Sequence, residues 1–111
     1  MNQCGGTFWH KEHGIKGNDL QIYDTNDSWW SETDRTMTPL RRLVPARVRF
    51  LGNDFGDARR VLDLGCGGGY MTDALAREHV NMIGVDLAHR ALIAARNRAA
   101  EKAYSAQFLR A

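Results

Sequence analysis

Five consecutive residues, Gly65-Cys66-Gly67-Gly68-Gly69, leave few folds open to this 111-residue chain. They follow the short apolar run Val61-Leu62-Asp63-Leu64, and apolar residues then recur at helical spacing over residues 70–79. A strand, a glycine-rich turn and a helix in this order are typical of the first βαβ unit of a nucleotide-binding α/β fold. We therefore predict a buried strand over 61–64 and a helix over 70–79.

The rest of the chain continues this alternation. Residues 82–85 are predicted to form a second strand and residues 106–110 a third, with an alanine-rich helix over 88–103 between them. One stripe of that helix is apolar: Ala88, Leu92, Ala95 and Ala99. Right-handed crossovers place the three strands in the spatial order 3-2-1. The predicted fold is half of a doubly wound sheet whose first strand has an unpaired apolar edge, like the N-terminal half of a larger domain.

The glycine turn is expected to hold an adenosine-containing ligand. It lies where the ligands of open α/β sheets bind, at the carboxyl end of a strand and the start of a helix. Free backbone N–H groups and the helix dipole would favour a negative group there. Asp86 follows Gly65 by 86 − 65 = 21 residues, at the end of the second strand. An acidic residue at that spacing usually accepts hydrogen bonds from ribose hydroxyls.

Two adenosine ligands compete for this turn. A nicotinamide cofactor would need a third glycine where Tyr70 stands, and Asp63 would repel its pyrophosphate. S-adenosylmethionine carries no phosphate, so a carboxylate beside its cationic methionine end is an asset. Arg47 could pair with the ligand carboxylate through a bidentate guanidinium. The residues favour S-adenosylmethionine and leave a nicotinamide dehydrogenase as the weaker alternative.

The motif D-x-G-x-G-x-G also supports S-adenosylmethionine. The run VLDLGCGGG, from Val61 to Gly69, followed by Gly84-Val85-Asp86, resembles the first two motifs of the class I S-adenosylmethionine-dependent methyltransferases. Upstream, Ser28-Trp29-Trp30 and the run from Pro39 to Arg47 are similar to segments of the ubiquinone-biosynthesis O-methyltransferase family. Where that family has Leu-His-Arg-x-Asn-Pro-x-Arg, this chain has Arg41 in place of histidine and Val44 in place of asparagine.

The resemblance implies a Rossmann-like fold, S-adenosyl-L-methionine as cofactor, and methyl transfer to an oxygen of a small aromatic acceptor of the quinone-precursor type. It places the catalytic base or metal, and most of the acceptor pocket, beyond the last residue. No catalytic or metal-ligating residue is therefore named, and the chain alone is expected to be inactive. The cofactor-binding residues that we predict are Arg47, Asp63, Gly65, Cys66, Gly67, Gly69, Asp86 and Leu87. A cofactor-binding fragment without chemistry, and methylation of another small molecule, stay open as alternatives.

Three segments are expected: a flexible leader (1–20), an N-terminal helical lid (21–58) and the truncated first half of the cofactor-binding domain (59–111). In the leader, Cys4, His10 and His13 are too few for zinc, which takes four ligands.

The expected lid contains aromatic residues and two short helices. Tyr23, Trp29 and Trp30 could either cover the cofactor or pack into the core. Helices are predicted over 39–43, capped by Thr38, and over 45–53, opened by Pro45. The apolar side chains expected to face inward are Leu40, Leu43, Val44, Val48 and Leu51.

The composition excludes several classes of protein. No apolar run approaches the roughly 20 residues of a membrane span, and the first residues lack the apolar stretch expected of a secretory signal. A net charge of +2, spread along the chain, does not indicate nucleic-acid binding. Two cysteines give no disulfide framework. We expect a cytoplasmic protein whose partners are a small-molecule acceptor and the missing C-terminal half of the domain; peripheral membrane association stays open.

Overall fold

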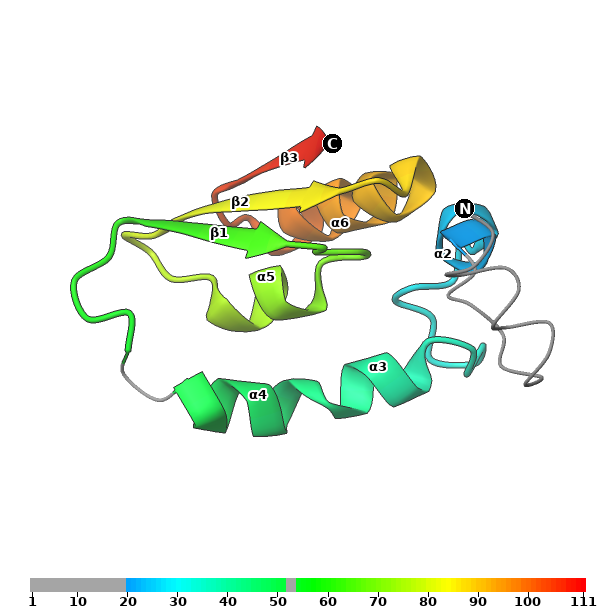
Figure 1. Ribbon diagram of the computed structural model, residues 1–111, viewed down its shortest axis with the longest axis horizontal. Coiled ribbons are helices and arrows are strands. Elements are labelled where there is room, and N and C mark those ends of the chain that lie inside the picture. The colour runs from blue at the N-terminus through cyan, green and yellow to red at the C-terminus, as the bar shows by residue number, and fades with distance from the viewer. Residues whose placement is uncertain (1–19, 52–53) are drawn as a thin grey trace, which may run out of the picture.

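The computed structural model describes residues 20–51 and 54–111, so the expected leader, with Cys4, His10 and His13, lies outside the described residues except for Leu20. Helices cover one face of a parallel three-stranded sheet (Figure 1). The elements in chain order are α2 (Leu20–Thr25), α3 (Thr38–Arg42), α4 (Val44–Leu51), β1 (Arg60–Leu64), α5 (Tyr70–Leu75), β2 (Asn81–Asp86), α6 (His89–Lys102) and β3 (Ala106–Arg110).

The sheet has the predicted topology. Its strands are parallel and lie in the order β1-β2-β3, with β1 at one edge. The register aligns Leu64 with Val85 and Val85 with Leu109. The α/β fold and the strand order are thus confirmed, and the carboxyl ends of β1 and β2 meet at the same end of the sheet.

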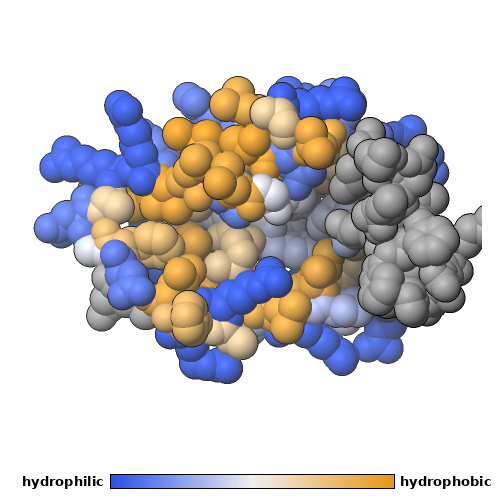
Figure 2. Space-filling model, viewed as in Figure 1, coloured by the Kyte–Doolittle hydropathy of each residue, from blue (hydrophilic) through white to orange (hydrophobic). Residues whose placement is uncertain are grey.

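The two faces of the sheet have different surroundings. Met82 and Gly84 of β2 are buried on the face covered by α5 and α6. On the opposite face Leu62, Leu64 and Leu109 are exposed, Leu64 to 74%. Figure 2 shows apolar side chains gathered over the strands on the face toward the viewer. The prediction of a buried first strand is therefore wrong for this chain, because among the described residues nothing covers that face.

The helices that follow β1 and β2 differ in how well their lengths were predicted. Helix α6 and its buried stripe of Ala88, Leu92, Ala95 and Ala99 are confirmed. Helix α5 ends at Leu75, not at residue 79. Its backbone turns to an extended conformation at Ala76, and the Arg77 guanidinium donates to the carbonyl oxygens of Ala74 and Ala76 at 3.2 and 2.9 Å. These bonds satisfy carbonyls at the helix end and stabilise the early stop.

Helix α4 packs beside α5, and α3 adjoins the N-terminal end of α4 (Figure 1). They lie where two short helices were predicted, and Pro45 is the second residue of α4. Thr38 is not the N-cap, since Met37 precedes the helix and no side chain caps it. Leu43 is exposed, so its predicted inward orientation is wrong, whereas Val44 packs against the core. Residues 52–53, at the predicted end of the second helix, lie outside the described ranges.

An aromatic core joins the segment between α2 and α3 to the rest of the domain. Trp29 is only 3% exposed and packs with Met37, Tyr70 and the first turn of α6. The Trp29 ring centroid lies 5.6 Å from that of Tyr70 and 6.1 Å from that of Tyr23. This core places the aromatic segment directly over the glycine turn. Within residues 20–51 and 54–111, no helix is long and apolar enough to cross a membrane.

Candidate cofactor-binding site

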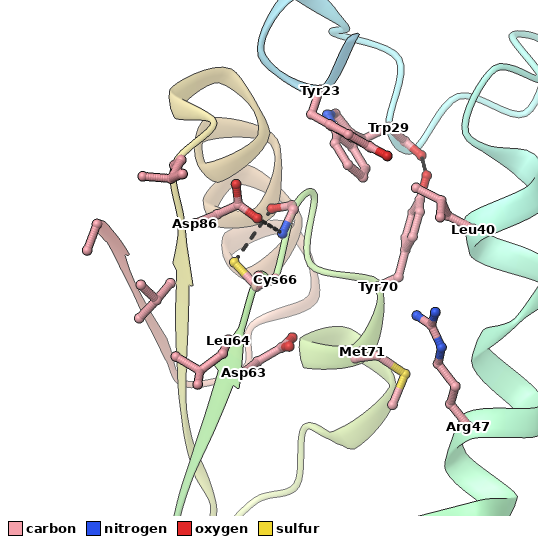
Figure 3. Close-up of a pocket in the computed structure, with 15 residues that line it drawn as sticks. Tyr23, Trp29, Leu40, Arg47, Asp63, Leu64, Cys66, Tyr70, Met71 and Asp86 are labelled. Carbon is pink, nitrogen blue, oxygen red and sulfur yellow. Dashed lines mark hydrogen bonds between the residues drawn. The ribbon is translucent and has the colours of Figure 1, made fainter. Parts of the chain in front are cut away.

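A cavity of about 620 Å³ opens at the carboxyl ends of β1 and β2 (Figure 3). Asp63 and Asp86 lie on its strand side, and Arg47 and Tyr70 face them across it. Most of the predicted site residues line this cavity: Arg47, Asp63, Gly65, Cys66, Gly67, Asp86 and Leu87. The structure therefore brings together residues that are up to 40 positions apart (87 − 47 = 40).

Gly69 is the predicted site residue that does not line the cavity. It has a φ of +87°, and a Cβ atom there would come within 2.9 Å of the Ala95 Cβ of α6. The next glycine upstream is equally constrained, since a Cβ on Gly68 would lie 2.4 Å from the Trp29 ring. Both positions need glycine because another element packs directly on the backbone. Their role is to let α6 and Trp29 approach the turn.

The backbone N–H groups of the turn are already used within the protein. Gly65 and Cys66 donate to the Val85 carbonyl oxygen at 2.7 and 3.0 Å. Gly67 donates to Asp86 Oδ2 at 2.8 Å, and Gly69 donates to the Cys66 carbonyl oxygen at 2.9 Å. The expectation that free N–H groups favour a negative ligand is therefore wrong at these positions. A turn with so few free donors suits a ligand without a pyrophosphate.

Asp86 joins the turn to β2 and still has capacity for a ligand. Its Oδ2 accepts from Gly67 N and its Oδ1 accepts from Ala88 N, both at 2.8 Å. Each carboxylate oxygen can accept a further hydrogen bond, because it carries two lone pairs. Two hydroxyl groups on neighbouring ribose carbons could use these remaining sites. The loop bonds fix the carboxylate before any ligand arrives.

Asp63 supplies negative charge deeper in the cavity. Burial raises the pKa of its carboxyl group, and the charge of Asp86 acts in the same direction. Hydrogen bonds from Thr72, whose Oγ1 donates to Asp63 Oδ2 at 2.7 Å, and the positive charge of Arg47 oppose that rise in pKa. A cation in the cavity would relieve the repulsion between the two carboxylates, and an added anion would increase it.

Arg47 provides the positive charge of the site. It projects from α4 into the cavity, on the side opposite the strands (Figure 3). Among the described residues its guanidinium has no hydrogen-bond or ion-pair partner, so its fork of N–H donors is available. A carboxylate is the group that this fork binds best at two points.

Cys66 is unsuited to act as a nucleophile. Burial, together with the charges of Asp63 and Asp86, raises the pKa of its thiol to about 12. The thiol is therefore protonated near neutral pH, in agreement with its interpretation as a small loop residue. In the described parts of the chain, no cluster of three or more acidic, histidine or cysteine side chains could hold a metal ion.

Part of the cavity wall was missed by sequence reasoning. Leu40, Tyr70 and Met71 line it from α3 and α5. Tyr70 was noted only as an obstacle to a nicotinamide cofactor, although its position directly after the glycines could have suggested a wall residue. Tyr23 and Trp29 pack together and also line the cavity, so that their covering of the cofactor stays a prediction.

The residues fit S-adenosylmethionine in their chemistry. The cavity combines an arginine for its carboxylate, an acid for its sulfonium and ammonium groups, and a second acid for its ribose hydroxyls. A nicotinamide dinucleotide would bring two phosphates to a turn in which four of the five backbone donors are used and the acidic side chains of Asp63 and Asp86 lie close by.

Comparisons with known proteins find similarity to methyltransferases. Residues 61–111 match the family described as "Methyltransferase domain". The chain is 32% identical over 91 residues to a ubiquinone biosynthesis O-methyltransferase of Cronobacter sakazakii, covering 80% of this chain and 37% of that protein. It is 30% identical over 101 residues to the corresponding protein of Salmonella paratyphi A, covering 87% and 41%. The chain thus spans about two fifths of the length of these relatives.

Solved structures agree on the fold. Magnesium protoporphyrin IX methyltransferase from Synechocystis PCC 6803, solved with bound SAH, has a TM-score of 0.56 at 20% identity, covering 99% of this chain and 48% of that one. A structure described in connection with the conversion of a disulfide bond into a thioacetal group during echinomycin biosynthesis has a TM-score of 0.53 at 33% identity, covering 60% and 28%.

Cavity chemistry and comparisons therefore agree on the cofactor, S-adenosyl-L-methionine. The chain therefore resembles the class I S-adenosylmethionine-dependent methyltransferases and, among its relatives, the ubiquinone biosynthesis O-methyltransferases.

Proposed function

We propose that this chain forms the cofactor-binding part of an enzyme that methylates an oxygen of a small aromatic acceptor of the quinone-precursor type. The observation that carries the proposal is the convergence of Arg47, Asp63 and Asp86 on one cavity, with charges complementary to those of S-adenosylmethionine. The names of the relatives favour an oxygen acceptor. The cytoplasm is the proposed location of this enzyme.

Each charged residue has a distinct role in this proposal. Arg47 binds the carboxylate of the cofactor, Asp63 stabilises its cationic end, and Asp86 accepts hydrogen bonds from its ribose. Cys66, Gly67 and Leu87 complete the wall around it, and Gly65 forms the turn. When bound, S-adenosylmethionine supplies an activated methyl group. The protein then contributes mainly by holding this group and the acceptor in line.

None of the cavity residues to which we give a role serves as the base that removes the proton of the acceptor. The Cys66 thiol is protonated near neutral pH, and Asp63 serves the cofactor in this proposal. We place the base or metal, and most of the acceptor pocket, in a polypeptide segment outside this sequence. This chain alone is accordingly expected to show no methylation of phenols or catechols.

Calorimetric titration of this chain with S-adenosylhomocysteine tests the cofactor site. We expect saturable binding that Asp86→Ala and Arg47→Met each weaken roughly tenfold or more, the size expected for a lost charged hydrogen bond. Arg49→Met is the matched control for Arg47→Met, since Arg49 is an exposed arginine on the same helix that does not line the cavity. Tighter binding of NAD, or no binding by a folded chain, would contradict the proposal.

A further inference from the structure

Trp30 contacts the glycine turn although it does not itself line the cavity. Its Nε1 donates to the Gly68 carbonyl oxygen at 2.8 Å. Its ring also meets the Tyr70 ring edge to face, with centroids 4.9 Å apart. Trp30 thus fixes the direction of the Gly68 carbonyl and supports Tyr70, which lines the cavity.

Arg98 of α6 holds Trp30 in this position. Its guanidinium carbon lies 4.1 Å from the centroid of the Trp30 ring, which is cation–π geometry. Its Nε donates to Asp73 Oδ1 of α5 at 3.1 Å, and both side chains are only 23% exposed. A partly buried, hydrogen-bonded ion pair is screened less than a surface pair, so it restrains the guanidinium more strongly.

The contacts of Arg98 lead back to the glycine turn by two routes. One route runs through Trp30 to the Gly68 carbonyl. The other runs through Asp73, whose backbone N–H donates to the Gly69 carbonyl oxygen at 2.8 Å. Arg98 therefore ties α5, α6 and the aromatic segment to two consecutive residues of the turn.

We propose that Arg98 is a positioning residue for the cofactor site. It does not line the cavity, and it acts through Trp30 and Asp73 on the glycine turn and on the aromatic wall. This inference rests on the proposed function of the cavity. Without the guanidinium, the Trp30 ring loses its cation–π contact, and the Gly68 carbonyl that Trp30 binds is held less firmly. The wall formed by Trp29 and Tyr70 then holds the cofactor less firmly.

A second arginine of α6 offers a matched control. Arg90 also pairs with an aspartate, Asp27, at 3.4 Å, but these side chains are 54% and 75% exposed. Among the described residues, no aromatic ring lies beneath the Arg90 guanidinium. Exposed pairs of this kind contribute little to stability. Arg90→Met and Arg98→Met therefore make the same chemical change on the same helix in two different settings.

The decisive experiment measures binding and release of S-adenosylhomocysteine by the full chain carrying Arg98→Met, Arg98→Lys or Arg90→Met. We expect Arg98→Met to weaken affinity roughly tenfold, mainly through faster dissociation. Arg98→Lys should recover part of the loss, because its ammonium can still lie over the Trp30 ring. Arg90→Met should bind like the wild type. Equal affinity of folded Arg98→Met and wild type would overturn the proposal.

A double-mutant cycle and amide exchange separate this inference from the proposed function. Trp30→Phe and Arg98→Met should be non-additive in their effects on affinity, and additive effects would contradict action through Trp30. Amide hydrogen exchange in residues 67–70 needs no ligand. We expect Arg98→Met to accelerate it and Arg90→Met to leave it unchanged. If the wild type binds no S-adenosylhomocysteine, the proposed function is wrong. The positioning role is tested separately by amide exchange, and it is rejected if Arg98→Met exchanges at the same rate as the wild type.

Discussion

At the scale of single residues, Asp63 lowers the stability of the folded chain and at the same time favours binding of a cation. Its carboxylate is partly removed from water and lies near a second carboxylate, and both effects raise its pKa. A charged group in this setting destabilises the folded chain when no ligand is bound. The same unrelieved charge is available to stabilise a cation in the cavity.

Asp63→Asn should therefore increase stability and weaken ligand binding. The amide oxygen can still accept the Thr72 hydrogen bond. The pKa of Asp63 is higher in the folded chain than in the unfolded chain. Protonated Asp63 therefore favours the folded state fully below the unfolded-state pKa, and this stabilisation is lost as the pH rises. Thermal unfolding should show the variant above the wild type near about pH 7, with the gap shrinking toward about pH 4 as Asp63 becomes protonated. A gap that widens at low pH would contradict this assignment.

The acidic and glycine residues that sequence reasoning placed at the site share one property, whereas Arg47 lies on helix α4 and was matched through the family resemblance. Asp63, Gly65 and Asp86 lie at the end of a strand or in the turn after it, where local order along the chain determines position. Leu40 and Met71 reach the cavity through the packing of helices, which no local pattern specifies. The expectation that the N–H groups of the turn are free was wrong for a similar reason. Their acceptors on Val85 and Asp86 belong to another strand, β2, and no local pattern in the turn specifies them.

At the scale of elements, α6 ends with an unusual residue. Ala103 follows its last turn with a φ of +58°, and Tyr104 N donates back to the Ala99 carbonyl oxygen at 3.2 Å. Glycine commonly occupies this left-handed position, because a Cβ atom is strained there. Alanine at this point leaves the helix end less stable than it could be.

Ala103→Gly is expected to stabilise the chain by about 0.5–1 kcal/mol. The relief of left-handed strain, about 1–2 kcal/mol, exceeds the entropy that glycine adds to the unfolded chain. Urea unfolding measures the difference. Ala100→Gly, at an exposed position inside the same helix, serves as control and should destabilise by about 1 kcal/mol. Equal destabilisation by both substitutions would show that Ala103 is not strained.

The elements differ in how far the sequence determines them. The bounds of α6 were predicted within one residue at each end, because its apolar stripe carries a sustained helical period. The bounds of β3 were predicted from its place as the third strand in the alternation of strands and helices. The end of α5 was not, since it depends on the side chain of Arg77 rather than on a glycine or proline. The exposure of Leu43 was also not predicted, because the helical period shows which residues share a face but not whether another element covers it.

At the scale of the whole molecule, the sheet leaves an apolar face and an unpaired edge among the described residues. Leu62 and Leu64 lie on that face at the edge strand, with Leu109 on β3 beyond β2. A β-edge with apolar neighbours is a template for pairing with another chain. The chain of this sequence is therefore expected to self-associate in solution.

Leu62→Lys should reduce this self-association. A charge at the edge opposes both strand pairing and burial of the open face. Sedimentation velocity over a range of concentrations measures the protein concentration at which half of the chains are associated. We expect Leu62→Lys to raise this concentration roughly tenfold. Phe50→Lys is the control, since Phe50 is highly exposed on α4, away from the sheet. A similar shift in both variants would mean that added charge alone, and not the edge, is responsible.

The order of the strands also determines the order in which they can pair during folding. Each strand pairs with the next strand in the sequence, so that Arg60 meets Asn81 after 81 − 60 = 21 residues and Met82 meets Ala106 after 106 − 82 = 24. Short closures of this kind cost little loop entropy and favour rapid folding. During synthesis β1 and β2 can pair once Asp86 has left the ribosome, before β3 exists. The glycine turn and the carboxylate that binds it, Asp86, thus come together in the earliest folding unit of the sheet.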